Sequence, residues 1–95
     1  MLEKNVEKAV CVYSKMYNYL TYKFTSPSNR SVPDRMFITE EGVIFFVEFK
    51  APGKKPTVLQ EHTIEKFKQR GVDVYVIDNI PDGKRLIDSY AGKAP

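Results

Sequence analysis

The first part of the chain places apolar residues with the period of an α-helix. Between Leu2 and Leu20 they recur every three or four positions, with lysines and other polar residues between them. This spacing predicts an amphipathic helix over residues 2–20. Thr21 to Thr25 then alternates like a half-buried strand, and Ser26 to Ser31 has the composition of a loop.

Two apolar runs in the middle of the chain predict a β-hairpin. They cover Arg35 to Thr39 and Val43 to Lys50, and Glu40-Glu41-Gly42 joins them. Three-residue hairpin loops commonly end in a residue with positive φ, a role that suits Gly42 because glycine has no Cβ. We therefore expect a tight antiparallel hairpin.

A second helix is expected after the hairpin. Pro52-Gly53 ends the second strand of the hairpin, and Thr57 can cap the N-terminus of a helix. The helix should run to about Arg70, with Gly71 closing it.

The end of the chain predicts one more strand and a short helix. Val72 to Ile77 is a strong strand pattern, and Pro81-Asp82-Gly83 is typical of a turn. Residues Lys84 to Tyr90 could then form a terminal helix, whereas Ala91 to Pro95 should fray.

The composition limits the kinds of protein that this chain can be. Its 95 residues suit one domain with a single modest core, and 42% hydrophobic with 28% charged residues is a globular balance. Cys11 and His62 are the only cysteine and histidine, so one chain cannot build a disulfide framework or a Cys/His zinc site. Any metal must be held by oxygen ligands.

The net charge of the chain suggests a class of binding partner, and its hydropathy suggests a cellular location. The net charge of +3 and the pI near 9.0 favour a polyanionic partner, although many proteins are this basic. The longest apolar run, Val43 to Val47, is far too short to span a bilayer. We expect a soluble protein of the cytoplasm.

The hairpin has a consequence for three charged residues. If Glu40 to Gly42 is the loop, counting back along both strands places Asp34 opposite Glu48. Because side chains alternate along a strand, Lys50 lies on the same face as these two acids. Two carboxylates and a lysine therefore converge at one end of the hairpin.

This convergence suggests metal-assisted chemistry. Directly opposed residues have Cβ atoms roughly 5 Å apart, and like charges so placed repel unless a cation lies between them. Mg²⁺ favours one or two carboxylates with water or phosphate oxygens, and Lys50 could activate water or stabilise charge on a phosphate. The simpler interpretation is that Asp34 and Glu48 are solvated strand ends and that Lys50 forms their salt bridge.

The same residues resemble a known family. Pro33-Asp34 followed by Glu48-Phe49-Lys50 resembles the PD-(D/E)xK nuclease superfamily. The wider strings SPSNRSVPDR (residues 26–35) and FVEFKAPGKK (residues 46–55) resemble one branch of it, the VRR-NUC (virus-type replication-repair nuclease) domains. The likeness extends from Glu3 to about Ile77. Ser31 is a departure, since many relatives have glycine there.

The resemblance implies a fold and an activity. The fold would be α/β, a mixed central sheet flanked by helices in the restriction-endonuclease-like order α-β-β-β-α-β-α, with residues 1–95 as one domain. The activity would be that of a Mg²⁺- or Mn²⁺-dependent endonuclease. Stand-alone viral members of the family look like Holliday-junction resolvases that act as homodimers, so the implied partners are branched DNA and a second copy of the chain.

The resemblance also implies roles for individual residues. Asp34 and Glu48 would be metal ligands, with the backbone carbonyl of Phe49 as a third, and Lys50 would be the catalytic lysine. Gln60 would support it from the second helix. The first helix should add a glutamate, Glu3 by preference, with Glu7 nearly as plausible.

Other side chains are weaker candidates. Four basic residues flank the proposed site and could hold DNA phosphates, or could be a solvated rim: Arg30, Arg35, Lys54 and Lys55. Four tyrosines could stack on bases, but their spacing fits core packing better or a dimer interface: Tyr13, Tyr17, Tyr19 and Tyr22.

Several functions remain open at this point. The leading one is a metal-dependent endonuclease that cuts four-way or related branched DNA. The alternatives are a nuclease for linear duplex or flap DNA, a module that binds DNA through Arg30, Lys54 and Lys55 without cutting, or one piece of a larger repair assembly.

Overall fold

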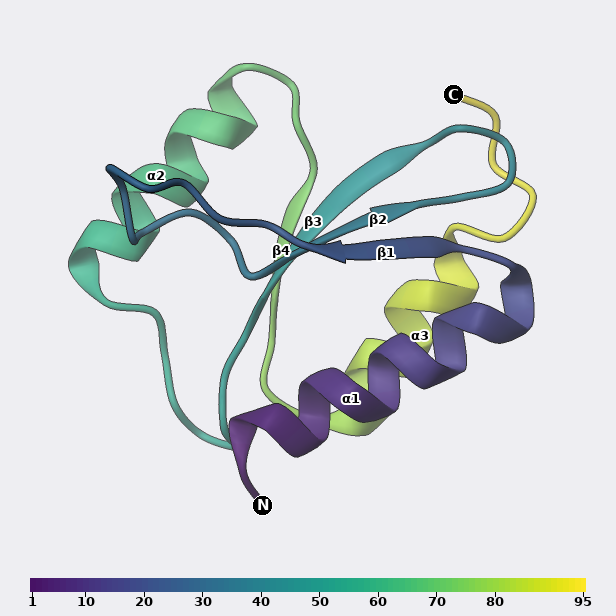
Figure 1. The fold of residues 1–95 in the computed structure, drawn as a ribbon, viewed down its shortest axis with the longest axis horizontal. Helices are drawn as coiled ribbons and strands as arrows, with labels where there is room; N and C mark the ends of the chain where they lie inside the picture. The colour runs from purple at the N-terminus through teal and green to yellow at the C-terminus, as the bar shows by residue number, and fades with distance from the viewer.

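The computed structural model describes residues 1–95, which form a mixed sheet with helices on both faces (Figure 1). The elements follow in the order α1 (Glu3–Ser14), 3₁₀ helix η1 (Lys15–Tyr17), β1 (Leu20–Lys23), β2 (Arg35–Ile38), β3 (Ile44–Phe49), α2 (Val58–Gln69), β4 (Val74–Ile77) and α3 (Ile80–Ser89). This confirms the predicted α/β class and the order of helices and strands. None of the helices is long and apolar enough to cross a membrane.

The four strands are ordered β1-β2-β3-β4, as in their sequence. β2 and β3 pair antiparallel with Arg35 opposite Val47 and Ile38 opposite Ile44, which is the predicted register. The loop is also as expected: the Thr39 N–H donates to the Val43 carbonyl at 2.9 Å, and Gly42 has a φ of 89°. β4 lies parallel to β3, and α2 makes the crossover between them.

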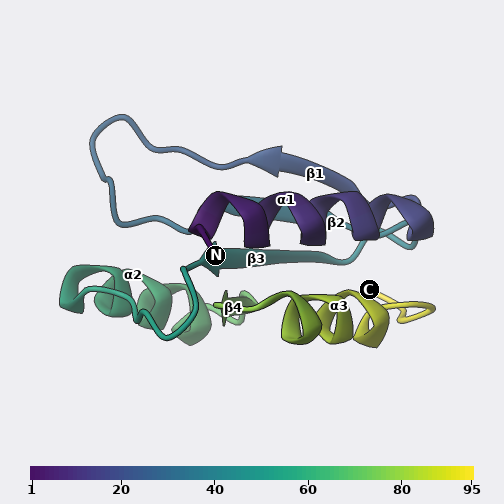
Figure 2. The same ribbon diagram turned by 90° about the horizontal axis from the view of Figure 1, so that it is seen from below.

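The larger part of the core lies on the sheet face covered by α1 and α3 (Figure 1; Figure 2). Val6 and Val10 of α1 pack there against the odd-numbered side chains of β2 and β3. Phe45 is at its centre, stacked on Phe37 with ring centroids 5.1 Å apart and on Tyr90 at 4.1 Å. This face carries most of the apolar burial of the molecule.

The opposite face carries α2 and a smaller cluster. Phe46, Ile64 and Val74 are its buried members. The helix begins as predicted, with a capping box in which the Gln60 N–H donates to the Thr57 hydroxyl and the Thr57 N–H donates to the Gln60 side-chain oxygen.

The end of the first helix was predicted wrongly. α1 stops at Ser14, one turn of 3₁₀ helix follows, and Asn18 adopts the left-handed conformation with a φ of 61°. The chain reverses there so that Tyr19 enters the core, while Leu20 and Tyr22 point outward from the edge strand. The expected core packing of Tyr22 is therefore also wrong, because its side chain is 55% exposed.

The start of the last helix was predicted wrongly as well. α3 begins at Ile80, because the Asn79 side chain accepts a hydrogen bond from the Asp82 N–H and Pro81 fits the first turn. Gly83, expected in a turn, is buried within the helix, and a Cβ at this position would collide with the side chain of Val10. The glycine lets α3 approach α1 closely.

Candidate functional site

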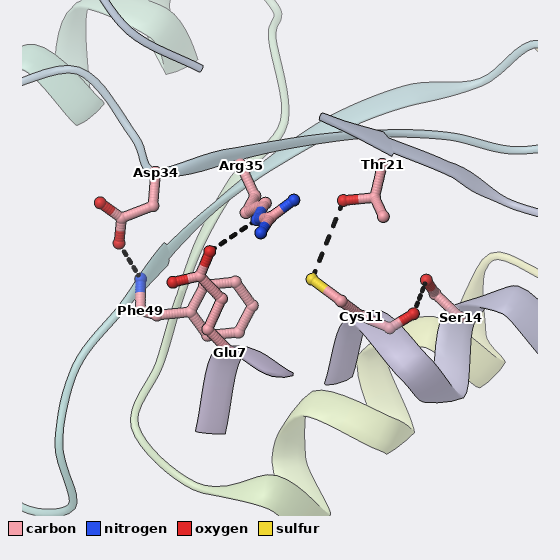
Figure 3. A network of polar contacts seen from close by, with 7 residues as sticks. All are labelled: Glu7, Cys11, Ser14, Thr21, Asp34, Arg35 and Phe49. Atoms are coloured by element: carbon pink, nitrogen blue, oxygen red, sulfur yellow. Dashed lines mark hydrogen bonds and ion pairs between the residues drawn. The ribbon is translucent and has the colours of Figure 1, made fainter. Parts of the chain in front are cut away.

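The predicted acidic pair lies where β2 begins and β3 ends, beside the first turn of α1 (Figure 1; Figure 2). Asp34 directly precedes β2, and one of its carboxylate oxygens accepts a hydrogen bond from the Phe49 N–H at 2.8 Å (Figure 3). Glu48 is in β3, and Lys50 follows its last residue. The antiparallel register of β2 and β3 thus brings Asp34 to the strand end that carries Glu48 and Lys50.

Glu48 is a buried carboxylate. Its residue is only 2% exposed, and burial together with the nearby Asp34 charge raises its pKa to about 7. The Lys50 ammonium, 3.3 Å from a Glu48 oxygen, opposes this shift and offsets it only in part. Glu48 is therefore not a solvated strand end, although the salt bridge of the simpler interpretation is present.

The surroundings of Asp34 also disfavour the charged form of its carboxyl, although less strongly than at Glu48. Burial raises the pKa of its carboxyl, and the hydrogen bond from the Phe49 N–H acts in the opposite direction. The charges of Glu3 and Glu7 raise it further, whereas Lys50 lowers it. The site thus holds two carboxylates that both gain from an added positive charge.

The two candidate glutamates of α1 have different surroundings. Glu7 is half-buried, and its carboxylate accepts a hydrogen bond from Arg35 Nε at 2.6 Å (Figure 3). Glu3 is exposed in the first turn, and its charge raises the pKa of both Asp34 and Glu48. Because the Glu7 carboxylate is paired with Arg35, Glu3 is the helical carboxylate that is more available to bind a ligand beside Asp34 and Glu48.

The donor set suits a hard divalent ion completed by water or substrate. No group of three or more His, Cys, Asp or Glu side chains is arranged to hold a metal on its own. Mg²⁺, however, is commonly bound by one or two protein carboxylates and keeps several waters. Two opposed carboxylates, one of them buried, with the Phe49 carbonyl between Glu48 and Lys50 in the chain, fit that requirement.

The structure does not join the remaining predicted residues to this pair by any hydrogen bond or ion pair. Gln60 uses its side-chain oxygen to cap α2, so any contact with Lys50 would fall to its amide nitrogen. Lys54 and Lys55 are exposed in the connection from β3 to α2, and Arg30 is exposed in the loop before β2. Arg35 turns toward α1, where it pairs with Glu7.

One contact near the site was not predicted. The buried Ser31 hydroxyl forms hydrogen bonds with Asn29 and with Thr63 of α2. It thereby ties the loop before Asp34 to the helix that covers this face of the sheet. No local pattern predicts this contact, because Thr63 lies 32 residues from Ser31 in the sequence.

Comparisons with known proteins agree with the fold. A four-stranded mixed sheet with helices on both faces defines an α/β domain. No family model matches the chain. The chain is 39% identical over 77 residues to "Putative nuclease p44" of Acyrthosiphon pisum secondary endosymbiont phage 1, covering 81% of this chain and 83% of the relative.

A solved structure described as "VRR_NUC domain" superposes with a TM-score of 0.85 at 30% identity, covering 93% of this chain and 96% of the other. The chain therefore belongs to the VRR-NUC nucleases.

Proposed function

We propose that residues 1–95 form one nuclease domain that hydrolyses phosphodiester bonds in DNA with the help of Mg²⁺ or Mn²⁺. The observation that carries the proposal is the buried Glu48, which lies close enough to Asp34 for the two charges to disfavour each other and has Lys50 at 3.3 Å. A domain that only binds DNA has no need for two repelling carboxylates. Membership of a nuclease family supports the same conclusion.

The metal ligands in this proposal are the carboxylates of Asp34 and Glu48 and the carbonyl of Phe49. A bound divalent ion supplies a Lewis acid for the scissile phosphate and lowers the pKa of water. The hydrogen bond from the Phe49 N–H fixes the orientation of the Asp34 carboxylate. Glu3, at the start of α1, adds a carboxylate for outer waters or metal.

Lys50 acts on the reacting atoms. Its ammonium is held at the strand end by Glu48, so it can donate to a phosphate oxygen as negative charge develops there or orient the attacking water. If Glu48 held an ion, its pair with Lys50 would weaken, and the ammonium could then contact the substrate. Gln60 contributes through its amide nitrogen.

The proposed substrate is a four-way or related branched junction, cut by a homodimer. Two copies related by a two-fold axis would place two such sites against the two strands of a symmetric junction. The similarity to stand-alone viral VRR-NUC domains supports this substrate. Arg30, Lys54 and Lys55 would hold phosphates beside the site.

The test is a cleavage assay with Mg²⁺ or Mn²⁺ on a four-way junction, linear duplex, flap and single-stranded DNA. Lys50→Ala should reduce the cleavage rate by about a hundredfold to a thousandfold, because it removes charge stabilisation in the transition state. Lys66→Ala, which removes an exposed lysine of α2, is the matched control and should cut normally. A wild-type protein that shifts these substrates in a gel but cuts none of them would contradict the proposal.

Metal binding can be tested without cleavage. Calorimetric titration of wild-type protein with Mn²⁺ should show binding that Asp34→Ala loses, because one carboxylate alone is a poor site. Glu3→Gln and Glu7→Gln separate the two helical candidates, and Glu3→Gln should weaken binding more. Equal Mn²⁺ affinity in wild type and Asp34→Ala would refute the metal site.

A further inference from the structure

A basic groove lies between α1 and the edge strand β1, outside the site described above. Its volume is about 440 Å³. Five cationic side chains line it, together with a single carboxylate, that of Glu7: Lys4, Lys8, Lys15, Lys23 and Arg35. The other residues that line it are uncharged: Cys11, Val12 and Thr21. The groove therefore has the charge of an anion-binding surface and the extent of a polymer site.

Three lysines form a row along one wall: Lys4 and Lys8 of α1, and Lys15, which begins the 3₁₀ helix η1 that continues it. Lys4, Lys8 and Lys15 lie within about 40° of one another around the helix, and they span about 16 Å of its length at 1.5 Å per residue. Lys23 of β1 faces them from the other wall. A DNA strand carries one phosphate per about 3.4 Å of helix axis, so this row can follow several consecutive phosphates.

One part of the groove reaches the candidate active site. Glu7 and Arg35 line the groove and pair with each other, and Asp34 precedes Arg35 in the chain (Figure 3). In the close view, Arg35 lies between Asp34 on one side and the Cys11–Thr21 contact on the other. A strand held in the groove would therefore run toward Asp34 and Glu48.

We infer that the α1–β1 groove binds the sugar-phosphate backbone of the DNA strand that leads to the scissile bond. This inference rests on the proposed nuclease function and adds a substrate contact to it. Lys4, Lys8, Lys15 and Lys23 are the binding residues, and the Glu7–Arg35 pair positions the inner part of the groove. The contacts are to phosphates, so they fix the path of the strand without reading sequence.

The test compares two double variants with the same loss of charge. Lys8→Gln/Lys15→Gln removes two exposed groove lysines, and Lys66→Gln/Arg70→Gln removes two exposed cations, one in α2 and one at its C-cap. Binding of a fluorescent duplex and a four-way junction is measured by anisotropy in EDTA from 50 to 300 mM NaCl. Cleavage with Mn²⁺ at saturating DNA is measured in parallel.

The groove variant should bind duplex about tenfold more weakly at 100 mM salt, and its salt slope should fall by about 1.8, which is about 0.9 for each lost phosphate contact. The control should stay within about twofold of wild type in affinity and should keep the wild-type cleavage rate. Circular dichroism checks folding, and the single variants Lys8→Gln and Lys15→Gln replace the double variant if it does not fold.

The outcomes separate the two proposals. If wild type binds and cuts DNA but the groove variant matches the control in affinity and slope, the groove inference is overturned and the nuclease proposal stands. An equal loss in both variants would mean diffuse attraction and would also overturn it. If wild type neither binds nor cuts any DNA, the proposed function itself is wrong.

Discussion

The two faces of the sheet differ in how many apolar residues they bury. On the α1/α3 face, eleven buried residues form one cluster, whereas the α2 face has three. Glu48 is two residues from Phe46 along β3, so its side chain points to the same face of the sheet, the α2 face with the smaller cluster. Burial of Glu48 is unfavourable for its charged form. A large core on one face of the sheet can therefore support an unfavourable buried carboxylate at the edge of the other face.

The largest expected difference between the faces comes from aromatic truncation. Phe45→Ala should lower the free energy of unfolding by about 3–5 kcal/mol, because it removes a fully buried ring and leaves a cavity. Phe67→Ala, on the half-buried edge of the α2 cluster, should cost clearly less. Urea denaturation measures both, and equal losses would show that the faces share stability evenly.

A charge change on the sparser face should alter how stability depends on pH. The folded-state pKa of Glu48, about 7, lies above its ordinary value of 4.5, so folding takes up protons between these values. Stability from this group is complete below pH 4.5 and is lost as pH rises through 7. In EDTA, wild type should lose on the order of 2 kcal/mol between pH 5 and 8 relative to Glu48→Gln.

Parallel pH profiles for wild type and Glu48→Gln would contradict the buried, repelled carboxylate. Mn²⁺ provides a second check at pH 8. It should stabilise wild type more than Glu48→Gln, because only wild type offers two carboxylates to the ion.

The contact of α1 with α3 tests how tightly the larger core is packed. Gly83→Ala would normally stabilise a helix, but here the added Cβ would collide with Val10. We expect a loss of about 1–2 kcal/mol in unfolding free energy, measured in urea. Gly83→Ala combined with Val10→Ala should recover part of the helix-propensity gain, and a stabilising Gly83→Ala alone would mean that the helices are not in close contact.

The smallest effect should come from the loop that precedes Asp34. Ser31→Ala removes buried hydrogen bonds to Asn29 and Thr63 and should cost about 1 kcal/mol. Its effect on cleavage should exceed that of Ser89→Ala, a control on the other face that removes a hydroxyl bonded to the Leu86 carbonyl. Identical cleavage rates in the two variants would show that the Ser31 tether does not position Asp34.

Local sequence was a good guide wherever a feature depended on neighbouring residues. The hairpin register follows from the three-residue loop and the positive φ of Gly42, and it places Asp34 against the strand end with Glu48. The capping box at Thr57 likewise depends on residues three apart. These contacts are short in sequence, so the pattern contains both partners.

The errors arose where distant segments decide the conformation. Tyr22 fits a buried strand pattern, but it lies on an edge strand and stays exposed. The Pro81-Asp82-Gly83 stretch is typical of a turn, but it lies in α3, whose N-terminus Asn79 caps. The side chain of Val10 in α1 leaves no room for a Cβ at Gly83. Local conformational propensity does not include contacts with residues that are distant in the sequence.

The sequence by itself determined the α/β order and the facing of Asp34 and Glu48, because periodicity and turn chemistry are local properties. Only the tertiary structure decided that Glu7 pairs with Arg35, that Glu48 is buried, and that the lysines of α1 face Lys23 across a groove. These features depend on how α1 docks on the sheet. Docking is set by the shape of the whole core, which no short stretch of sequence contains.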